Sequence, residues 1–515
     1  MQIEYKKINN NGGIKMTRLT RTLHKATAAA AAAASAVLLC TLPKVSADGA
    51  PDILNDAEWN AFVEEKMELD SVPGMTLAAV SGSETGFKSW GYADIGEQSP
   101  VTEDTVFGIG SCSKAFTALT IFLLQEEGRL SVEDSVSDYL PWWHVTWQGE
   151  EQDTKIWQLM NHCSGIPDST MMKFPIGTDD TLKEETARIA EDIGLVYEPA
   201  TAFEYCNLGY DVLAYITETV SGMPFEEYVR QEIFLPIGMM SSGYDTPTAQ
   251  GYRIFFGSMT EYDEPFFRGC CGDGGIRSTA KDMSLWLNAQ LGNTELPEKL
   301  RNAIAASHET PDAHRSGGEQ MTEYFYGWNH YNGYMFHSGT TPSFSSYIII
   351  DPERSVGIFT SANAWVYTAD YGANSLYQIM KGEPINKEQL DIPDLLGLID
   401  TVSVCITVIG IIEIAAVIVL TLTRKKRLAG RETTYKKERG RLCRRLTVLI
   451  PAFCLSVICP NILTCFMGYG AASYRMVGVW LPYSFLVAFF VTDAALLAMI
   501  ASSIGRFIHC KRTAR

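Results

Sequence analysis

Positive charge is scarce over most of this 515-residue chain. Residues 48–396 contain 19 Lys and Arg against 54 Asp and Glu, a formal charge of −35, whereas the remaining residues together carry +17. A strongly acidic globular part excludes nucleic-acid binding, which requires a basic face. The chain as a whole is 46% hydrophobic and 11% aromatic, which excludes a disordered protein.

Cysteine and histidine patterns that bind metals are also missing. The chain has no C-x-x-C pair and no His/Cys spacing typical of a metal site, so we expect no metal and no other cofactor. The acidic part holds five cysteines, an odd number that cannot all pair with one another. We interpret them as buried free thiols rather than a disulfide framework: Cys112, Cys163, Cys206, Cys270 and Cys271.

Apolar and basic segments lie at both ends of the chain. Four basic residues between Lys15 and Lys25 precede the apolar run Ala26 to Leu42, and Val45-Ser46-Ala47 supplies small residues at cleavage-type positions. This pattern predicts a secretory signal peptide over residues 1–47. An uncleaved membrane anchor is the alternative, because the run approaches spanning length.

Three further apolar runs close the chain, over residues 398–423, 446–467 and 477–504, and each exceeds the roughly 20 residues that a helix needs to cross a bilayer. Eleven Lys and Arg fall in the loop 424–445, and the tail 505–515 is also basic. The positive-inside rule therefore predicts a cytoplasmic loop and tail. The domain 48–381, followed by the linker 382–397, is then outside the cell on a multi-pass membrane protein.

Ionisable residues in or near these spans, Asp400, Glu413 and Asp493, are candidates for function. Interhelical hydrogen bonding, or an interfacial position for Asp400, explains them equally well. The predicted partners are thus the lipid bilayer and, through the three spans, a membrane protein.

Strand patterns at both ends of the domain surround a mostly helical middle. Strands are predicted at 76–80, 87–92, 334–336, 347–350 and 356–361, and helices at 56–68, 111–127, 211–219, 225–233 and 371–380. Gly272 to Gly275 is predicted to be a flexible turn. This order indicates one α+β domain whose sheet unites the two ends of the domain.

The segment Gly110 to Phe116 contains a serine and a lysine three residues apart. If a helix starts at Ser111, Ser111 and Lys114 lie one turn apart on the same face. A serine hydroxyl needs a base to become a nucleophile, and a lysine buried beside it can lose its proton near neutral pH and fill that role. Alone, this spacing is a weak signal because both residue types are common.

Two more segments carry residues suited to the same chemistry. In Phe203 to Tyr210, Tyr205 can relay a proton and the Asn207 amide can hold a substrate carbonyl. In Phe336 to Thr340, the small Gly339 lets a substrate backbone approach, and a backbone N–H there can help to bind an oxyanion. Taken singly, the alternative for Tyr205 is a core tyrosine, and the alternative for His337 is a surface or capping residue.

In this order the three segments resemble the motifs S-x-x-K, Y-x-N and H-x-G of the serine β-lactamases and penicillin-binding proteins, specifically the class C β-lactamase-like branch. The resemblance covers Leu54 to Met380 and includes connecting stretches at 127–131, 139–141, 159–167 and 274–279. It implies a β-lactamase/transpeptidase-like fold, an antiparallel sheet with a helical subdomain, here followed by transmembrane helices.

The resemblance also implies roles for individual residues. Ser111 would be the acylated nucleophile, Lys114 its base partner and Tyr205 the general acid/base. Asn207 would orient the substrate amide, His337 and Gly339 would flank the cleft, and the N–H groups of Ser111 and Thr340 would form the oxyanion hole.

Several positions depart from the branch pattern. His337 stands in place of a lysine, so a fixed positive charge for a substrate carboxylate is missing, which suits a peptidase or esterase better than a dedicated β-lactamase. Cys112 and Cys206 occupy motif positions where small residues are usual, and Ala200 replaces the usual glycine before Phe203.

The leading hypothesis is an extracytoplasmic serine hydrolase acting on cell-wall D-alanyl peptides or esters. A β-lactamase or broad carboxylesterase is the alternative enzyme, and a sensor that is acylated without turnover is the alternative of another class.

Overall fold

The computed structural model describes residues 45–46, 52–174, 176, 180–190, 193–265, 269–317, 323–424, 426, 435–466 and 474–513. Of the predicted signal peptide, only Val45–Ser46 fall within this part, as the short strand β1 beside β3. The remainder of that prediction lies outside the described residues.

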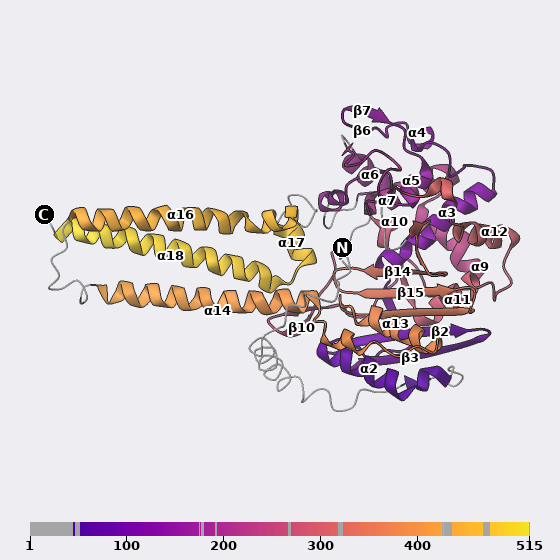
Figure 1. Ribbon diagram of the computed structural model, residues 1–515, viewed down its shortest axis with the longest axis horizontal. Coiled ribbons are helices and arrows are strands. Elements are labelled where there is room, and N and C mark those ends of the chain that lie inside the picture. The colour runs from indigo at the N-terminus through magenta and orange to yellow at the C-terminus, as the bar shows by residue number, and fades with distance from the viewer. Residues whose placement is uncertain are drawn as a thin grey trace. The chain divides into compact units, whose positions relative to one another are not determined.

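An antiparallel sheet forms the centre of the domain, in the order β1-β3-β2-β16-β15-β14-β13-β12; strands β2, β3, β14 and β15 can be followed in Figure 1. Its main strands are β2 (Gly74–Ser81), β3 (Glu84–Asp94), β12 (Glu323–Phe325), β13 (Trp328–Tyr331), β14 (Tyr334–Thr340), β15 (Ser345–Asp351) and β16 (Val356–Ala362). Because β2 pairs with β16, the sheet joins the two ends of the domain, and the predicted α+β fold is confirmed.

Alternating strand residues face two separate cores. Leu77, Ala79 and Ile349 face helices α2 (Ala57–Leu69) and α13 (Thr368–Met380), whereas Ala78 and Ile348 face the helical subdomain. That subdomain contains α3 (Lys114–Glu126), α5 (Ile156–Met160), α6 (Leu182–Ala190), α7 (Asn207–Ser221), α8 (Phe225–Val229), α11 (Ala280–Gln290) and α12 (Glu298–Ser307). Every residue of α3 from Lys114 to Leu124 is buried, whereas its sequence pattern predicts burial of one side only.

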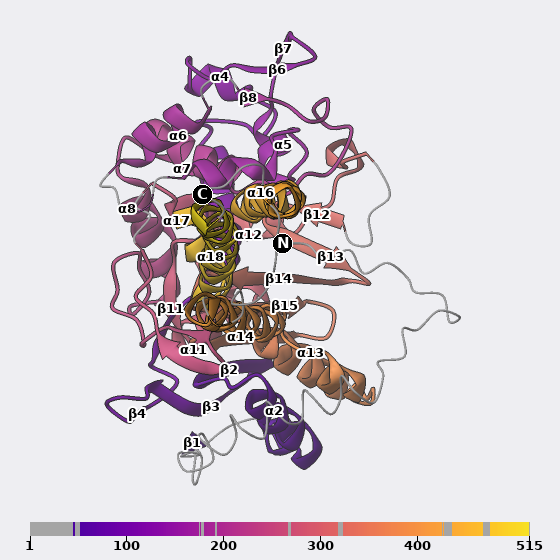
Figure 2. The ribbon, with the colours of Figure 1, turned by 90° about the vertical axis from the view of Figure 1, so that its left-hand side faces the viewer.

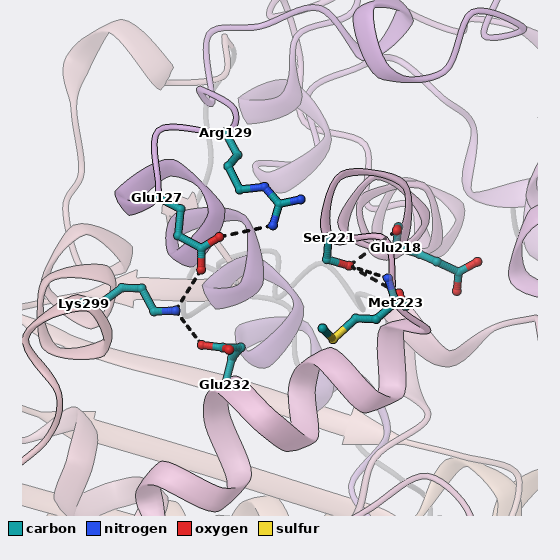
Figure 3. A network of polar contacts seen from close by, with 7 residues as sticks. All are labelled: Glu127, Arg129, Glu218, Ser221, Met223, Glu232 and Lys299. Carbon is teal, nitrogen blue, oxygen red and sulfur yellow. Dashed lines mark hydrogen bonds and ion pairs between the residues drawn. The ribbon is translucent and has the colours of Figure 1, made fainter.

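A network of ion pairs fixes the far end of α3. Lys299 on α12 lies 2.8 Å from Glu127, directly after α3, and 2.5 Å from Glu232 (Figure 3). Arg129 adds a second contact to Glu127 at 3.3 Å. These partly exposed contacts link the end of α3 to α12.

The segment Gly272 to Gly275, predicted to be a flexible turn, is mostly a one-turn helix, α10 (Cys271–Gly274). A Cβ atom at Gly272 would lie 2.4 Å from the carbonyl oxygen of Tyr210. The glycine is thus needed for close packing of α10 on α7, and the prediction of a loose turn is wrong.

In the part of the chain that the structure describes, three helices are long and apolar enough to cross a membrane: α14 (Leu395–Leu422), α16 (Tyr435–Phe466) and α18 (Tyr483–Thr513). They run side by side in Figure 1 and are seen end-on in Figure 2. The third apolar run differs from the prediction, because residues 474–480 form a separate helix, α17 (Tyr474–Trp480). Pro482, which lacks an amide hydrogen, follows the break.

Candidate active site

Ser111 lies in a tight helical turn that leads directly into α3. This turn, η2, spans Gly110–Ser113 and is continued by Lys114. Gly110 adopts φ +50°, and a Cβ atom there would lie 2.6 Å from the amide nitrogen of Thr340. Only glycine fits both conditions, so the turn places Ser111 next to the end of β14.

Lys114 is completely buried, and each hydrogen of its ammonium group has an acceptor. Its Nζ lies 3.1 Å from Ser111 Oγ, 2.7 Å from Asn207 Oδ1 and 2.7 Å from the Asp273 carbonyl oxygen. Burial alone would lower the pKa of Lys114, but the nearby Tyr205 and Asp273 more than offset it, and the net pKa is raised. The three acceptors and the raised pKa favour the ammonium form of Lys114 in the resting site, and its role as the base partner of Ser111 stays a prediction.

Tyr205 completes the group around Lys114. The centroid of its ring lies 5.0 Å from Lys114 Nζ. Burial raises the pKa of the phenol, although the charge of Lys114 and hydrogen bonds with Lys114 and Ser111 lower it. The structure thus brings together four of the predicted site residues, Ser111, Lys114, Tyr205 and Asn207.

His162 supports the segment that contains Tyr205 through two hydrogen bonds to its backbone. Its Nδ1 accepts the amide hydrogen of Cys206 at 3.1 Å, and its carbonyl oxygen accepts that of Glu204 at 2.7 Å. The imidazole lies 4.2 Å from the Tyr205 ring, centroid to centroid. Burial, with the Lys114 charge, lowers the pKa of His162 well below its usual value, so the ring is a neutral acceptor.

A buried carboxylate positions the third acceptor of Lys114. Asp211 Oδ1 accepts the amide hydrogens of Gly272 at 3.1 Å and Asp273 at 3.2 Å, which orients the α10 turn. The Asp273 carbonyl then points at Lys114. Sequence reasoning missed this contact because a backbone carbonyl has no residue-type signal.

His337 points into the domain interior from β14. Its Nδ1 lies 2.6 Å from the Ser338 carbonyl oxygen and therefore carries the hydrogen, which leaves Nε2 to accept from the Tyr324 hydroxyl at 3.0 Å. Burial and the Lys114 charge lower the pKa of His337 to about 3. The imidazole is thus neutral under physiological conditions. Tyr324, its partner, was also missed, since it lies on the short strand β12.

Gly339 is required for close packing inside the domain. A Cβ atom there would lie 2.0 Å from the carbonyl oxygen of Ile109, inside the domain. The missing side chain therefore lets β14 pack against the segment that leads into η2, and the approach of a substrate backbone at Gly339 stays a prediction.

The outer edge of β14 is nevertheless open next to the site. Strand β13 pairs with β14 only as far as Phe336, so within the described part of the sheet His337–Thr340 has no β13 partner. Thr340, one of the two predicted oxyanion donors, ends this stretch beside Gly110.

The cysteines near the motifs are buried and free. Burial raises the pKa of Cys112 and of Cys206 to about 12, so neither is a thiolate at neutral pH. Ala200 adopts φ +67°, a conformation that favours glycine, and the turn is retained. Among the described residues, no cluster of His, Cys, Asp and Glu could hold a metal ion.

The fold and the serine–lysine–tyrosine arrangement together define a serine hydrolase of the β-lactamase and penicillin-binding-protein type. A family model described as Beta-lactamase matches residues 59–378. The chain therefore belongs to the β-lactamase family.

Individual relatives agree with this assignment. "Protein flp" of Staphylococcus aureus strain COL is 27% identical over 323 residues, which are 60% of this chain and 64% of that protein. The strain MW2 version is 25% identical over 90% of this chain and 93% of its own length. "Penicillin-binding protein 4*" of Bacillus subtilis strain 168 is 31% identical over 54% of this chain and 64% of that protein.

The match thus spans less than two thirds of the length of the COL and Bacillus relatives. Among solved structures, the octameric penicillin-binding protein homologue from Pyrococcus abyssi has a TM-score of 0.55 at 27% identity, covering 67% of this chain and 80% of that one.

Proposed function

We propose that this protein is a membrane-anchored hydrolase that removes D-alanyl groups from cell-wall peptides or esters through an acyl-enzyme on Ser111. The observation that carries the proposal is the buried Lys114 ammonium ion, shared between Ser111 Oγ and Asn207 Oδ1 beside the Tyr205 phenol.

In the reactive form, a Tyr205 phenolate is paired with the Lys114 ammonium ion. Ser111 Oγ attacks the substrate carbonyl carbon and passes its proton to Tyr205 Oη, while the amide hydrogens of Ser111 and Thr340 bind the developing oxyanion. The bond to the leaving group then breaks, and Tyr205 returns the proton to the departing nitrogen or oxygen. Water releases the acyl group by the same steps, with the proton going back to Ser111.

The neutral His337 favours substrates that need no fixed cation at this position. A lysine here would hold a substrate carboxylate permanently, whereas an imidazole with a pKa of about 3 carries no charge near pH 7. Ser338 is exposed on the open edge of β14, where an extended substrate backbone can pair with the strand. The neutral imidazole suits D-alanyl esters, which carry no such carboxylate, better than a dedicated β-lactamase substrate, and the open strand edge suits an extended peptide backbone.

Turnover by the full chain in detergent tests the proposal with four substrates: a D-alanyl ester, a peptide ending in D-Ala-D-Ala, nitrocefin and a short-chain carboxylic ester. The expected result is multiple turnovers of a D-alanyl substrate, lost in Ser111→Ala. Preference for nitrocefin or the simple ester would instead indicate a β-lactamase or broad carboxylesterase. Stable acylation without turnover would indicate a sensor, and equal rates for wild type and Ser111→Ala would overturn the proposal.

The catalytic domain is proposed to face the outside of the cell. Asp400, near the start of α14, contacts the domain, whereas Arg424 at the end of α14 contacts Ser502 on α18. The domain and the basic loop therefore belong to opposite ends of the helices, as the positive-inside rule requires. Protease added to intact cells should remove the domain but leave residues 435–445 uncut; the opposite pattern would reverse the topology.

A further inference from the structure

A hairpin of the catalytic domain is joined to the membrane helices at two buried points. This hairpin consists of β9 (Tyr252–Phe255) and β10 (Ser258–Glu261). At its turn, the amide hydrogens of Phe256 and Gly257 are donated to the Asp400 carboxylate of α14, at 2.9 and 2.7 Å. Asp400 is only 1% exposed, and its contact with this hairpin is a partner that its sequence context did not reveal.

The second buried contact is made by Arg253 on β9, three residues before the turn residue Phe256. Arg253 donates from Nη1 to the Gly478 carbonyl oxygen at 2.9 Å and from Nη2 to that of Leu481, both at the end of α17. Its guanidinium also lies 4.3 Å from the Tyr262 ring centroid and 5.3 Å from that of Tyr483. A cation at the carbonyl end of a helix is favourable.

The α17 segment itself packs on the domain. Met476 and Val477 are buried within the core of the helical subdomain, and Trp480 packs edge-on against Trp365 at 5.7 Å. Burying the charged groups of Asp400 and Arg253 is costly unless hydrogen bonds compensate, and here backbone groups supply such bonds. These contacts form a built interface rather than a loose tether.

The same hairpin leads to the oxyanion side of the active site. Three residues after β10 ends, the half-buried Glu264 accepts hydrogen bonds from Thr341 Oγ1, from the Ser343 amide at 2.6 Å and from Ser343 Oγ at 2.9 Å. These bonds fix the turn that directly follows Thr340. A short, continuous path thus connects the start of two membrane helices to one of the proposed oxyanion donors.

We propose that the membrane helices are part of the catalytic support, and that Asp400, Arg253 and Glu264 are positioning residues for the Thr340 turn. The proposal rests on the proposed function, in which the Thr340 amide binds the oxyanion. It gives the spans a second role beyond anchoring, and it predicts that loosening the hairpin lowers the acylation rate of Ser111.

The test uses the full chain in detergent micelles and the variants Asp400→Asn, Arg253→Met and Glu264→Gln. Glu413→Gln is the matched control, because it makes the same carboxylate-to-amide change on α14 about 20 Å further along the helix. Two quantities are measured: the rate of Ser111 acylation by a fluorophosphonate probe, and amide hydrogen exchange over residues 252–264 and 341–344.

Full loss of an oxyanion donor lowers rates by about 10²–10³-fold, so a partial displacement predicts a fall of about tenfold. We expect this fall in all three variants, with faster exchange over 341–344, a lower kcat and little change in KM for an ester substrate. Glu413→Gln should match the wild type.

A fall in Glu264→Gln alone, with Asp400→Asn and Arg253→Met unchanged in rate and in exchange over 341–344, would overturn the proposal and leave the spans as an anchor. Absence of acylation in the wild type would contradict the proposed function instead. Exchange over 252–264 and 341–344 would still test the support, because it requires no catalysis.

Discussion

Replacing Lys114 by Met tests the electrostatic account of the site. The substitution keeps a side chain of similar length but removes the charge that contacts Ser111 Oγ at 3.1 Å and lies against the Tyr205 ring. Hydrogen bonds to charged groups contribute about 1.5–3 kcal/mol each, so losing two in the transition state costs about 3–6 kcal/mol. Since about 1.4 kcal/mol is tenfold in rate, acylation should fall by about 10²–10⁴-fold.

Stability should change less than the activation free energy in Lys114→Met, because two opposing effects act on the folded state. Asn207 Oδ1 and the Asp273 carbonyl oxygen lose their donor, at a cost of about 1–3 kcal/mol each. The variant is also relieved of burying a charge, which offsets part of that cost.

The assay is the second-order rate constant for acylation by a fluorophosphonate, with thermal unfolding measured in parallel. Lys281→Met is the control, because that lysine is exposed and pairs with Asp104 at the surface. An acylation rate for a folded Lys114→Met protein within about threefold of the wild type would refute the reasoning.

Three further outcomes follow from the structure. The pKa of His337 is lowered from 6.5 to about 3, so the folded state resists protonation there, and the stability that depends on the neutral ring is complete above about pH 6.5 and falls toward pH 3. Between pH 6.5 and 5, the wild type should lose at most about 2 kcal/mol more of its unfolding free energy than His337→Gln in denaturant titrations. Equal losses for the two proteins would contradict this prediction. Gly339→Ala should destabilise the domain by about 1–3 kcal/mol or more in the same titrations, whereas Gly194→Ala, with open space around it, should not; a Gly339→Ala protein of wild-type stability would disprove the close contact. Lys299→Met should lower stability by only about 0.2–1 kcal/mol, and the difference should vanish in 1 M salt because its ion pairs are partly exposed; a salt-independent loss would point to packing instead.

Local patterns predicted the elements of the domain well. The continuous apolar run Tyr347–Ile350 and the helical spacing around Trp59 are patterns among neighbours along the chain, and both elements are found, as β15 and α2. The short strands β12 and β13 were missed, because three or four residues carry too little periodicity. Tyr324, the partner of His337, was missed with them.

The ordered motifs indicated which residues to examine, but not their protonation states. Whether a buried lysine is neutral depends on its acceptors, and one acceptor of Lys114 is a backbone carbonyl from a distant segment. The role of Gly339 likewise depends on Ile109, more than 200 positions away. Such contacts are set by tertiary packing and leave no trace in local sequence.

Apolar composition alone also placed the third membrane segment too early. Met476 and Val477 are as apolar as a spanning helix requires, but they are buried against the catalytic domain. Hydrophobicity reports that a residue avoids water and does not distinguish a protein core from lipid.

Mass spectrometry of the full chain after reaction with a fluorophosphonate tests the central claim most directly. The account predicts one adduct, on the peptide that contains Ser111, and none in a folded Ser111→Ala protein. An adduct on another residue of the wild type, or full labelling of Ser111→Ala, would contradict it.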